Sequence, residues 1–308
     1  MKTKSTLLSL FALTSFLFPI CGLADSNNTK DKAGESVESA LENQSSTSKW
    51  AGSVSSSSMT WLKDQQTYGA NAPIGADQYV AVDYKLTDKL VLEVGYNFTL
   101  MNNNLYAYQP YYPNSGYISQ DPQITLKQTL GTIGASEPVN LWYTLYLPAS
   151  NIDRTVRGGY GILRLDASTT FLLPGRWAVM PWETARIYLN NANDSLGTAS
   201  VYRLTLGGAL VYNFTKAFNA YAWPQLDLRS TDVNYGTLRF NVMNRYQTEL
   251  GVSYTVKAGK SDITINPAII NYVYLDSGMG LGQASYATTD PSGYNPTLEL
   301  DFNVAATF

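Results

Sequence analysis

The amino-acid sequence predicts an all-β fold, a closed antiparallel up-and-down barrel of about twelve strands that crosses a membrane. Three observations predict it. Apolar side chains alternate with small or polar ones through most of the chain after Trp50, most clearly over residues 90–101. Short connections between these segments alternate with mostly longer ones. The last segment, residues 297–308, is amphipathic and ends in Phe.

The individual strands follow from this alternation and from the turn-forming residues between its segments. They are expected at residues 49–62, 78–86, 90–101, 123–135, 139–147, 157–172, 177–190, 198–214, 218–230, 238–256, 262–275 and 297–308. An even number of strands, with short turns at one end and longer loops at the other, is typical of an outer-membrane barrel with both termini in the periplasm. Pro181 and Glu183 interrupt the alternation, so we expect a β-bulge there.

A membrane location explains why the sheet should close. After the N-terminal leader the chain has no run of about 18 apolar residues, so strands rather than helices would have to cross the bilayer. Hydrocarbon offers no hydrogen-bond partner to a backbone, and strands are stable there only without an open edge. The alternative is a soluble β-sandwich, but strands of up to about seventeen residues exceed the usual five or six.

The N-terminal residues indicate export. Lys2 and Lys4 precede an apolar stretch, residues 7–20, and Gly22-Leu23-Ala24 is a small-x-small cleavage site, so residues 1–24 are interpreted as a signal peptide. Lipidation of Cys21 is the alternative, but Ile20 precedes it where a lipoprotein signal has Gly or Ala. Residues 25–48 are polar and form a tail or a luminal plug, which leaves residues 49–308 for the barrel.

The composition excludes several classes of function. The chain has 308 residues and no His, and its only Cys lies in the leader. Serine-histidine triads, imidazole bases, thiolate nucleophiles and His- or Cys-ligated metals are therefore excluded, and we expect no enzyme, no catalytic residue, no metal and no cofactor. A net charge of -3 without a basic block also argues against nucleic acid as a partner.

The last strand carries the most specific signal. Its apolar face comprises Leu298, Leu300, Phe302, Val304, Ala306 and Phe308. An amphipathic final strand that ends in Phe resembles the signal by which the barrel assembly machinery recognises Gram-negative outer-membrane proteins, with Phe302, Val304 and Phe308 as the matching positions here. The resemblance implies a bacterial outer-membrane location. It implies the assembly machinery, outer-membrane lipid and lipopolysaccharide as partners.

If the apolar faces point to lipid, the opposite parity gives the lumen. The predicted pore-lining residues are Lys85, Glu93, Lys127, Trp142, Arg164, Asp166, Arg186, Arg203, Trp223, Asp227, Arg229, Arg239, Arg245 and Glu249. The acids Asp83, Glu299 and Asp301 share this parity. Separated basic and acidic arrays would create a field across a water-filled pore. Alternatively, the same charges would pair across strands and close the lumen.

These two possibilities for the lumen, open or closed, predict two alternative functions. The first is an outer-membrane channel of the small-porin type, similar in architecture to twelve-stranded channels, which passes small polar solutes or ions by passive diffusion through a charged lumen. The second is a non-conducting barrel that acts as an adhesin, receptor or structural protein. In that case salt bridges or the N-terminal segment would close the lumen.

Overall fold

The computed structural model describes residues 49–61, 74–101, 116–134, 136–149, 159–190, 202–230, 245–274 and 298–308. The signal peptide, residues 25–48 and Arg239 lie outside these ranges. The strands are β1 (Trp50–Trp61), β2 (Gly75–Thr87), β3 (Leu90–Met101), β4 (Gly116–Thr132), β5 (Pro138–Tyr146), β6 (Gly159–Ser168), β7 (Phe171–Leu172), β8 (Trp177–Asn190), β9 (Tyr202–Asn213), β10 (Phe218–Ser230), β11 (Arg245–Ala258), β12 (Ser261–Tyr274) and β13 (Leu298–Thr307).

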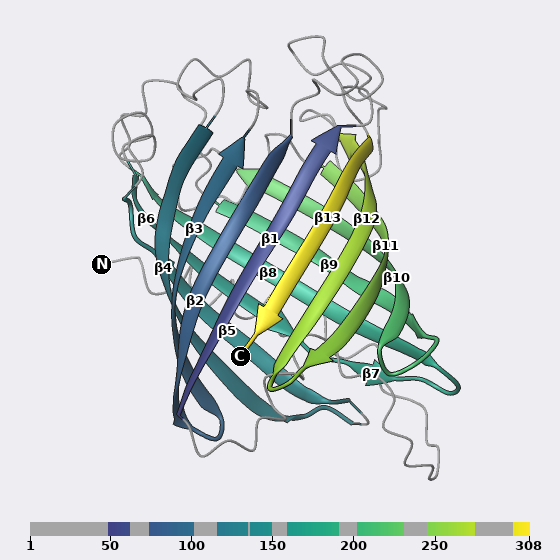
Figure 1. Ribbon diagram of the computed structural model, residues 1–308. Helices are drawn as coiled ribbons and strands as arrows, with labels where there is room; N and C mark the ends of the chain where they lie inside the picture. Colours follow the sequence, from purple (N-terminus) through teal and green to yellow (C-terminus); the bar gives the residue numbers. More distant parts are fainter. Residues whose placement is uncertain are drawn as a thin grey trace.

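These strands form one closed antiparallel barrel (Figure 1). Each strand pairs with the next along the chain, except that β6 pairs with β8, and β13 pairs with β1 from Ser53↔Thr307 to Trp61↔Glu299. The short β7 continues β6, since both pair with β8, so the described ring has twelve positions. Because every strand has a neighbour on both sides, the barrel presents no open edge to a surrounding membrane.

The strand predictions are confirmed closely. Residues 90–101, 177–190 and 218–230 form β3, β8 and β10 with the expected bounds. The largest difference is in β4, which begins at Gly116 although its start was expected at residue 123. Pro122, just before the expected start, lies inside the strand, next to a shift in the β3–β4 register between Tyr96 and Phe98. The irregularity accommodates the missing N–H of the proline.

The predicted bulge at Pro181 and Glu183 is wrong. The register between β8 and β9 runs unbroken from Trp177↔Tyr212 to Ile187↔Tyr202. Pro181 lies opposite Gly208, and a Cβ on this glycine would come within 3.0 Å of the Pro181 Cα, so the missing side chain lets the two backbones approach closely. The proline instead weakens the pairing of β8 with the segment between β6 and β7. The Thr169 N–H donates to the Pro181 carbonyl at 3.4 Å, but Pro181 has no N–H with which to form the second hydrogen bond of the pair. The break between β6 and β7 follows.

The polarity of the barrel is inverted relative to a soluble protein. Val82, Val94 and Leu250 are 48%, 54% and 57% exposed on the outer face, whereas Thr184 and Asp227 on the inner face are 0% and 2% exposed. In water such an outer surface would be an aggregation hazard, and in lipid it is the expected one. Among the described residues, no helix is long and apolar enough to span a membrane.

Aromatic side chains gather near both ends of the outer surface. At the end with the short turns, Trp50 lies 4.6 Å from Tyr84, and Trp177, Tyr212, Phe214 and Phe218 form a chain of ring contacts at 4.8–5.1 Å. At the other end Phe98 contacts Tyr96 and Tyr117 at 5.9 and 5.5 Å. Such girdles anchor a barrel at the two membrane interfaces. That the turn end is periplasmic stays a prediction.

Candidate functional site

An arginine row crosses three neighbouring strands on the inner wall. Arg164 of β6 is the register partner of Arg186 of β8, which is the partner of Arg203 of β9. Neighbouring strands are about 4.8 Å apart, so the backbones that carry these three positively charged side chains lie close together. We call these three residues the arginine row. Arg229 of β10 continues its register, although only the backbone of this residue is described.

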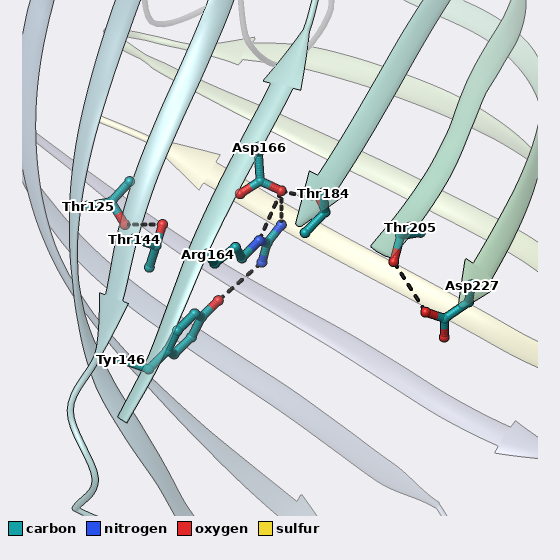
Figure 2. Close-up of polar contacts among 8 residues, drawn as sticks. All are labelled: Thr125, Thr144, Tyr146, Arg164, Asp166, Thr184, Thr205 and Asp227. Carbon is teal, nitrogen blue, oxygen red and sulfur yellow. Dashed lines mark hydrogen bonds and ion pairs between the residues drawn. The ribbon is translucent and has the colours of Figure 1, made fainter. Parts of the chain in front are cut away.

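Two aspartates neutralise the ends of the arginine row. Arg164 donates to Asp166 Oδ1 from Nε at 2.9 Å and from Nη2 at 2.6 Å, and Thr184 donates to the same oxygen (Figure 2). Arg203 donates to Asp227 Oδ1 at 2.7 Å. Both carboxylates are almost completely buried, whereas the two arginine side chains keep 22% and 18% of their exposure. The wall therefore presents its cations, and not its anions, to the lumen.

Asp227 also accepts hydrogen bonds from a second arginine and from a threonine. Arg245, at the start of β11, donates from Nε to Asp227 Oδ2 at 3.2 Å. Thr205 donates to Oδ1 of the same carboxylate at 3.3 Å (Figure 2). The guanidinium of Arg245 also lies 4.8 Å from the centre of the Tyr272 ring. These contacts extend the basic side of the wall to β11.

Arg186, in the middle of the row, differs from its neighbours. Its Nε is excluded from solvent and has no hydrogen-bond partner, and the side chain makes no ion pair with any described residue. Arg164 and Arg203 are also supported by tyrosines: Arg164 donates from Nη1 to the Tyr146 hydroxyl at 3.1 Å, and Arg203 interacts with Tyr188. Arg186 thus carries a positive charge, with its Nε buried, that no carboxylate among the described residues pairs.

Carboxylates line another side of the lumen. They are Asp77 of β2, Glu249 of β11, and Glu299 and Asp301 of β13. Each accepts a hydrogen bond from a neutral side chain: Thr99 and Gln120 for Asp77, Tyr221 for Glu249, Tyr272 for Glu299 and Ser57 for Asp301. None of the four forms an ion pair with a described residue. This side therefore carries acidic groups that have no cationic partner among the described residues.

The two sides face each other across the barrel. In the ring of twelve positions, β6, β8 and β9 lie six places from β13, β1 and β2. Arg164, Arg186, Arg203, Asp77, Glu299 and Asp301 all lie within the six strand residues nearest the loop end of their strands. Opposed arrays of fixed charge at one level create a field across the lumen. We call this level the charged belt.

A separate cluster lies nearer the short turns. Lys127 contacts Asp83 at 3.1 Å and Glu93 at 2.7 Å, and its Nζ lies 5.6 Å from the centre of the Trp142 ring. Tyr79 donates to Glu93 at 2.6 Å. Lys127 thus pairs with a carboxylate on the neighbouring strand and with one two strands away, and such salt bridges between strands stiffen the barrel wall. The cluster is electrically more balanced than the charged belt.

Two glycines make room for inward tyrosines. The Tyr79 ring lies across Gly95 and the Tyr221 ring across Gly251, so that a Cβ on either glycine would come within 2.3–2.5 Å of the tyrosine hydroxyl. Both tyrosines then reach a glutamate two residues from the glycine, Glu93 or Glu249. In the sequence, Glu-Val-Gly and Glu-Leu-Gly at these positions are the features that could have indicated the two tyrosine contacts. Alternation alone does not indicate them.

The structure brings six of the predicted pore-lining residues into the basic side of the belt: Arg164, Asp166, Arg186, Arg203, Asp227 and Arg245. Glu249 lies on the acidic side, and Glu93, Lys127 and Trp142 lie in the turn-side cluster. Trp223 packs against Trp182 at 5.6 Å.

Lys85 lies at the turn rim. Its Nζ is 2.9 Å from Asp88 Oδ1, and the hydrogen bond and charge of Lys85 lower the pKa of Asp88. Asp77, Thr184 and Tyr188 were not singled out from the sequence, although they share the inward parity. At the end of β13, Phe302 and Phe308 are 48% and 56% exposed on the outer face, where the assembly signal was expected; the role in assembly stays a prediction.

The closed ring, the apolar outer face with aromatic girdles and the polar inner face define an outer-membrane β-barrel, and its location is the bacterial outer membrane. No protein-family model and no curated protein matches the sequence. Among solved structures, an outer membrane channel from Pseudomonas putida F1 has a TM-score of 0.49 at 12% identity and covers 92% of this chain and 100% of its own.

Two further structures show similar coverage. The KdgM porin in complex with disordered oligogalacturonate has a TM-score of 0.44 at 7% identity and covers 83% of this chain and 98% of its own. The translocator domain of the autotransporter NalP from Neisseria meningitidis has a TM-score of 0.40 at 8% identity, with 88% of this chain and 92% of its own covered.

Proposed function

We propose that the protein is an outer-membrane channel that passes small polar solutes or ions by passive diffusion through its charged lumen. The observation that carries the proposal is the direction of the ion pairs. Arg164–Asp166 lies within one strand, Arg203–Asp227 and Arg245–Asp227 join neighbouring strands, and Lys127 reaches at most two strands away. Among the described residues, no ion pair crosses the lumen from one side of the charged belt to the other.

This arrangement favours a water-filled lumen over one that is closed by salt bridges. A closed lumen would pair the arginines of β6, β8 and β9 with the carboxylates of β13 and β2, because unpaired buried charges are costly. Instead the carboxylates bond to neutral donors, and Arg164 and Arg203 keep about a fifth of their side-chain exposure. Solvated charges of opposite sign, held apart, favour polar solutes over apolar ones.

Planar-bilayer recording of the refolded mature protein tests the proposal. Discrete current steps are expected, and the reversal potential in a salt gradient measures the ion preference that the fixed charges of the belt impose. A preparation unfolded by heat before addition is the negative control. Silence of the folded protein, under conditions in which a known porin conducts, would contradict a channel and support a non-conducting barrel.

A further inference from the structure

We propose that the arginine row is a binding site for an oxyanion, the carboxylate or phosphate group of a small organic solute, with Arg186 as its central ligand. The inference rests on the proposed channel function and specifies the class of solute that such a channel would take. It is carried by the one member of the row whose guanidinium nitrogen Nε is buried without a hydrogen-bond partner.

The charges on the basic side do not balance. Arg164, Arg186, Arg203 and Arg245 contribute four positive charges, and Asp166 and Asp227 contribute two negative ones. Both aspartates are already engaged with other arginines. Asp166 balances Arg164, and Asp227 is shared by Arg203 and Arg245, so one of the two excess positive charges lies in the middle of the row, at Arg186, and the other is shared by Arg203 and Arg245.

The geometry of the row suits an oxyanion. A guanidinium presents several N–H groups in one plane, which match the two oxygens of a carboxylate or phosphate and form charge-assisted hydrogen bonds. Arg164 and Arg203 flank Arg186 in register, so that their charges add to the attraction at its position. Tyr146 accepts a hydrogen bond from Arg164, and its own O–H remains able to donate to an anion.

The alternative to an anion site is an ion pair between Arg186 and Asp166. Its Oδ2 is also buried without a hydrogen-bond partner, and a rotation of the Arg186 side chain toward this oxygen would satisfy both groups. In the register, however, Asp166 lies opposite Thr184 rather than Arg186, and Thr184 and Arg164 hold the other oxygen of this carboxylate. An anion-binding measurement separates the two arrangements, because an Arg186 that is paired with Asp166 contributes little to anion affinity.

The experiment is a calorimetric titration of the full mature protein, folded in detergent, with inorganic phosphate and with acetate. Saturable binding of at least one anion is expected. Arg186→Gln should weaken it by about tenfold or more, since a charge-assisted contact is lost. Arg186→Lys should weaken it severalfold, because the charge stays but the planar fork is lost. Lys260→Gln, which removes an exposed cation in the β11–β12 turn, is the matched control and should leave the affinity unchanged.

The outcomes are distinguishable from those of the channel experiment. Equal phosphate and acetate affinities in the parent protein and in Arg186→Gln would overturn the oxyanion site, as would the absence of saturable binding of both anions to the parent. Should Arg186→Gln fail to fold, the Lys variant decides, and unchanged affinity there overturns the bidentate role. A protein that binds the anion but conducts no current would leave the site in place and refute the channel.

Discussion

Asp227→Asn removes the one negative charge that holds two arginines on the lumen wall. The parent carboxylate is 2% exposed and accepts hydrogen bonds from Arg203 at 2.7 Å and from Arg245 at 3.2 Å. An asparagine has the same shape and keeps one oxygen as an acceptor, but it cannot neutralise either guanidinium. We expect the variant to fold into the same barrel with a lower free energy of unfolding.

The magnitude follows from the exposure of the partners. Removing one member of a fully buried ion pair costs about 3–5 kcal/mol, mainly because the other charge stays buried and unpaired. Here Arg203 and Arg245 retain 18% and 22% of their side-chain exposure, so lumen water partly solvates them. We therefore expect a loss near the low end, about 3 kcal/mol, which is about a hundredfold in the folding equilibrium constant.

Urea titration of the protein in phospholipid vesicles measures this loss, with tryptophan fluorescence and the electrophoretic mobility of the folded barrel as independent readouts. Asp88→Asn is the matched control, because Asp88 is 94% exposed in a turn and pairs with Lys85 in water, where an ion pair contributes little. An Asp227→Asn protein as stable as this control would refute the claim that the aspartate anchors both arginines.

Three further substitutions test separate features of the barrel. Gly251→Ala places a Cβ 2.5 Å from the Tyr221 ring and should cost about 1–3 kcal/mol in urea unfolding, whereas Gly131→Ala, with no atom within 4 Å, should not; equal stabilities would contradict the ring position. Glu183→Leu removes a carboxylate from the lipid-facing parity and should stabilise the barrel in vesicles by on the order of 1 kcal/mol, so a loss of stability would instead indicate a partner for Glu183 in the membrane. Asp301→Asn should shift the reversal potential toward anion preference, and an unchanged potential would place this residue outside the conducting path.

Much of the barrel could be predicted from the sequence because its signal is local. In residues 90–101 the period-two alternation defines a strand and both of its faces, and β3 has those bounds. The same parity placed Arg164 and Asp166 together on the inner face, and they form an ion pair. Where a proline interrupts the pattern, the sequence does not show which neighbouring strand adapts: the bulge expected at Pro181 and Glu183 was wrong, and β4 continues through Pro122 to begin seven residues before its expected start.

The charged belt itself depends on information that a single strand does not contain. The arginine row exists because Arg164, Arg186 and Arg203 come into register, and a shift of two residues in one strand would leave every parity unchanged and dissolve the row. The contact of Asp227 with Arg245 likewise joins two strands that are separated by residues 231–244. Alternation predicts which side of the wall a charge occupies, and register decides which charge it meets.

The seam between the first and last strands has a consequence for biogenesis. Ser57 of β1 donates to Asp301 of β13 across 244 residues of sequence, and the whole β1–β13 ladder joins the two ends of the barrel. Until the last strand has been synthesised and docked, both β1 and β12 expose unpaired backbone groups that could recruit another chain. A chain that ends before residue 298 would therefore keep two such edges and could not close the ring.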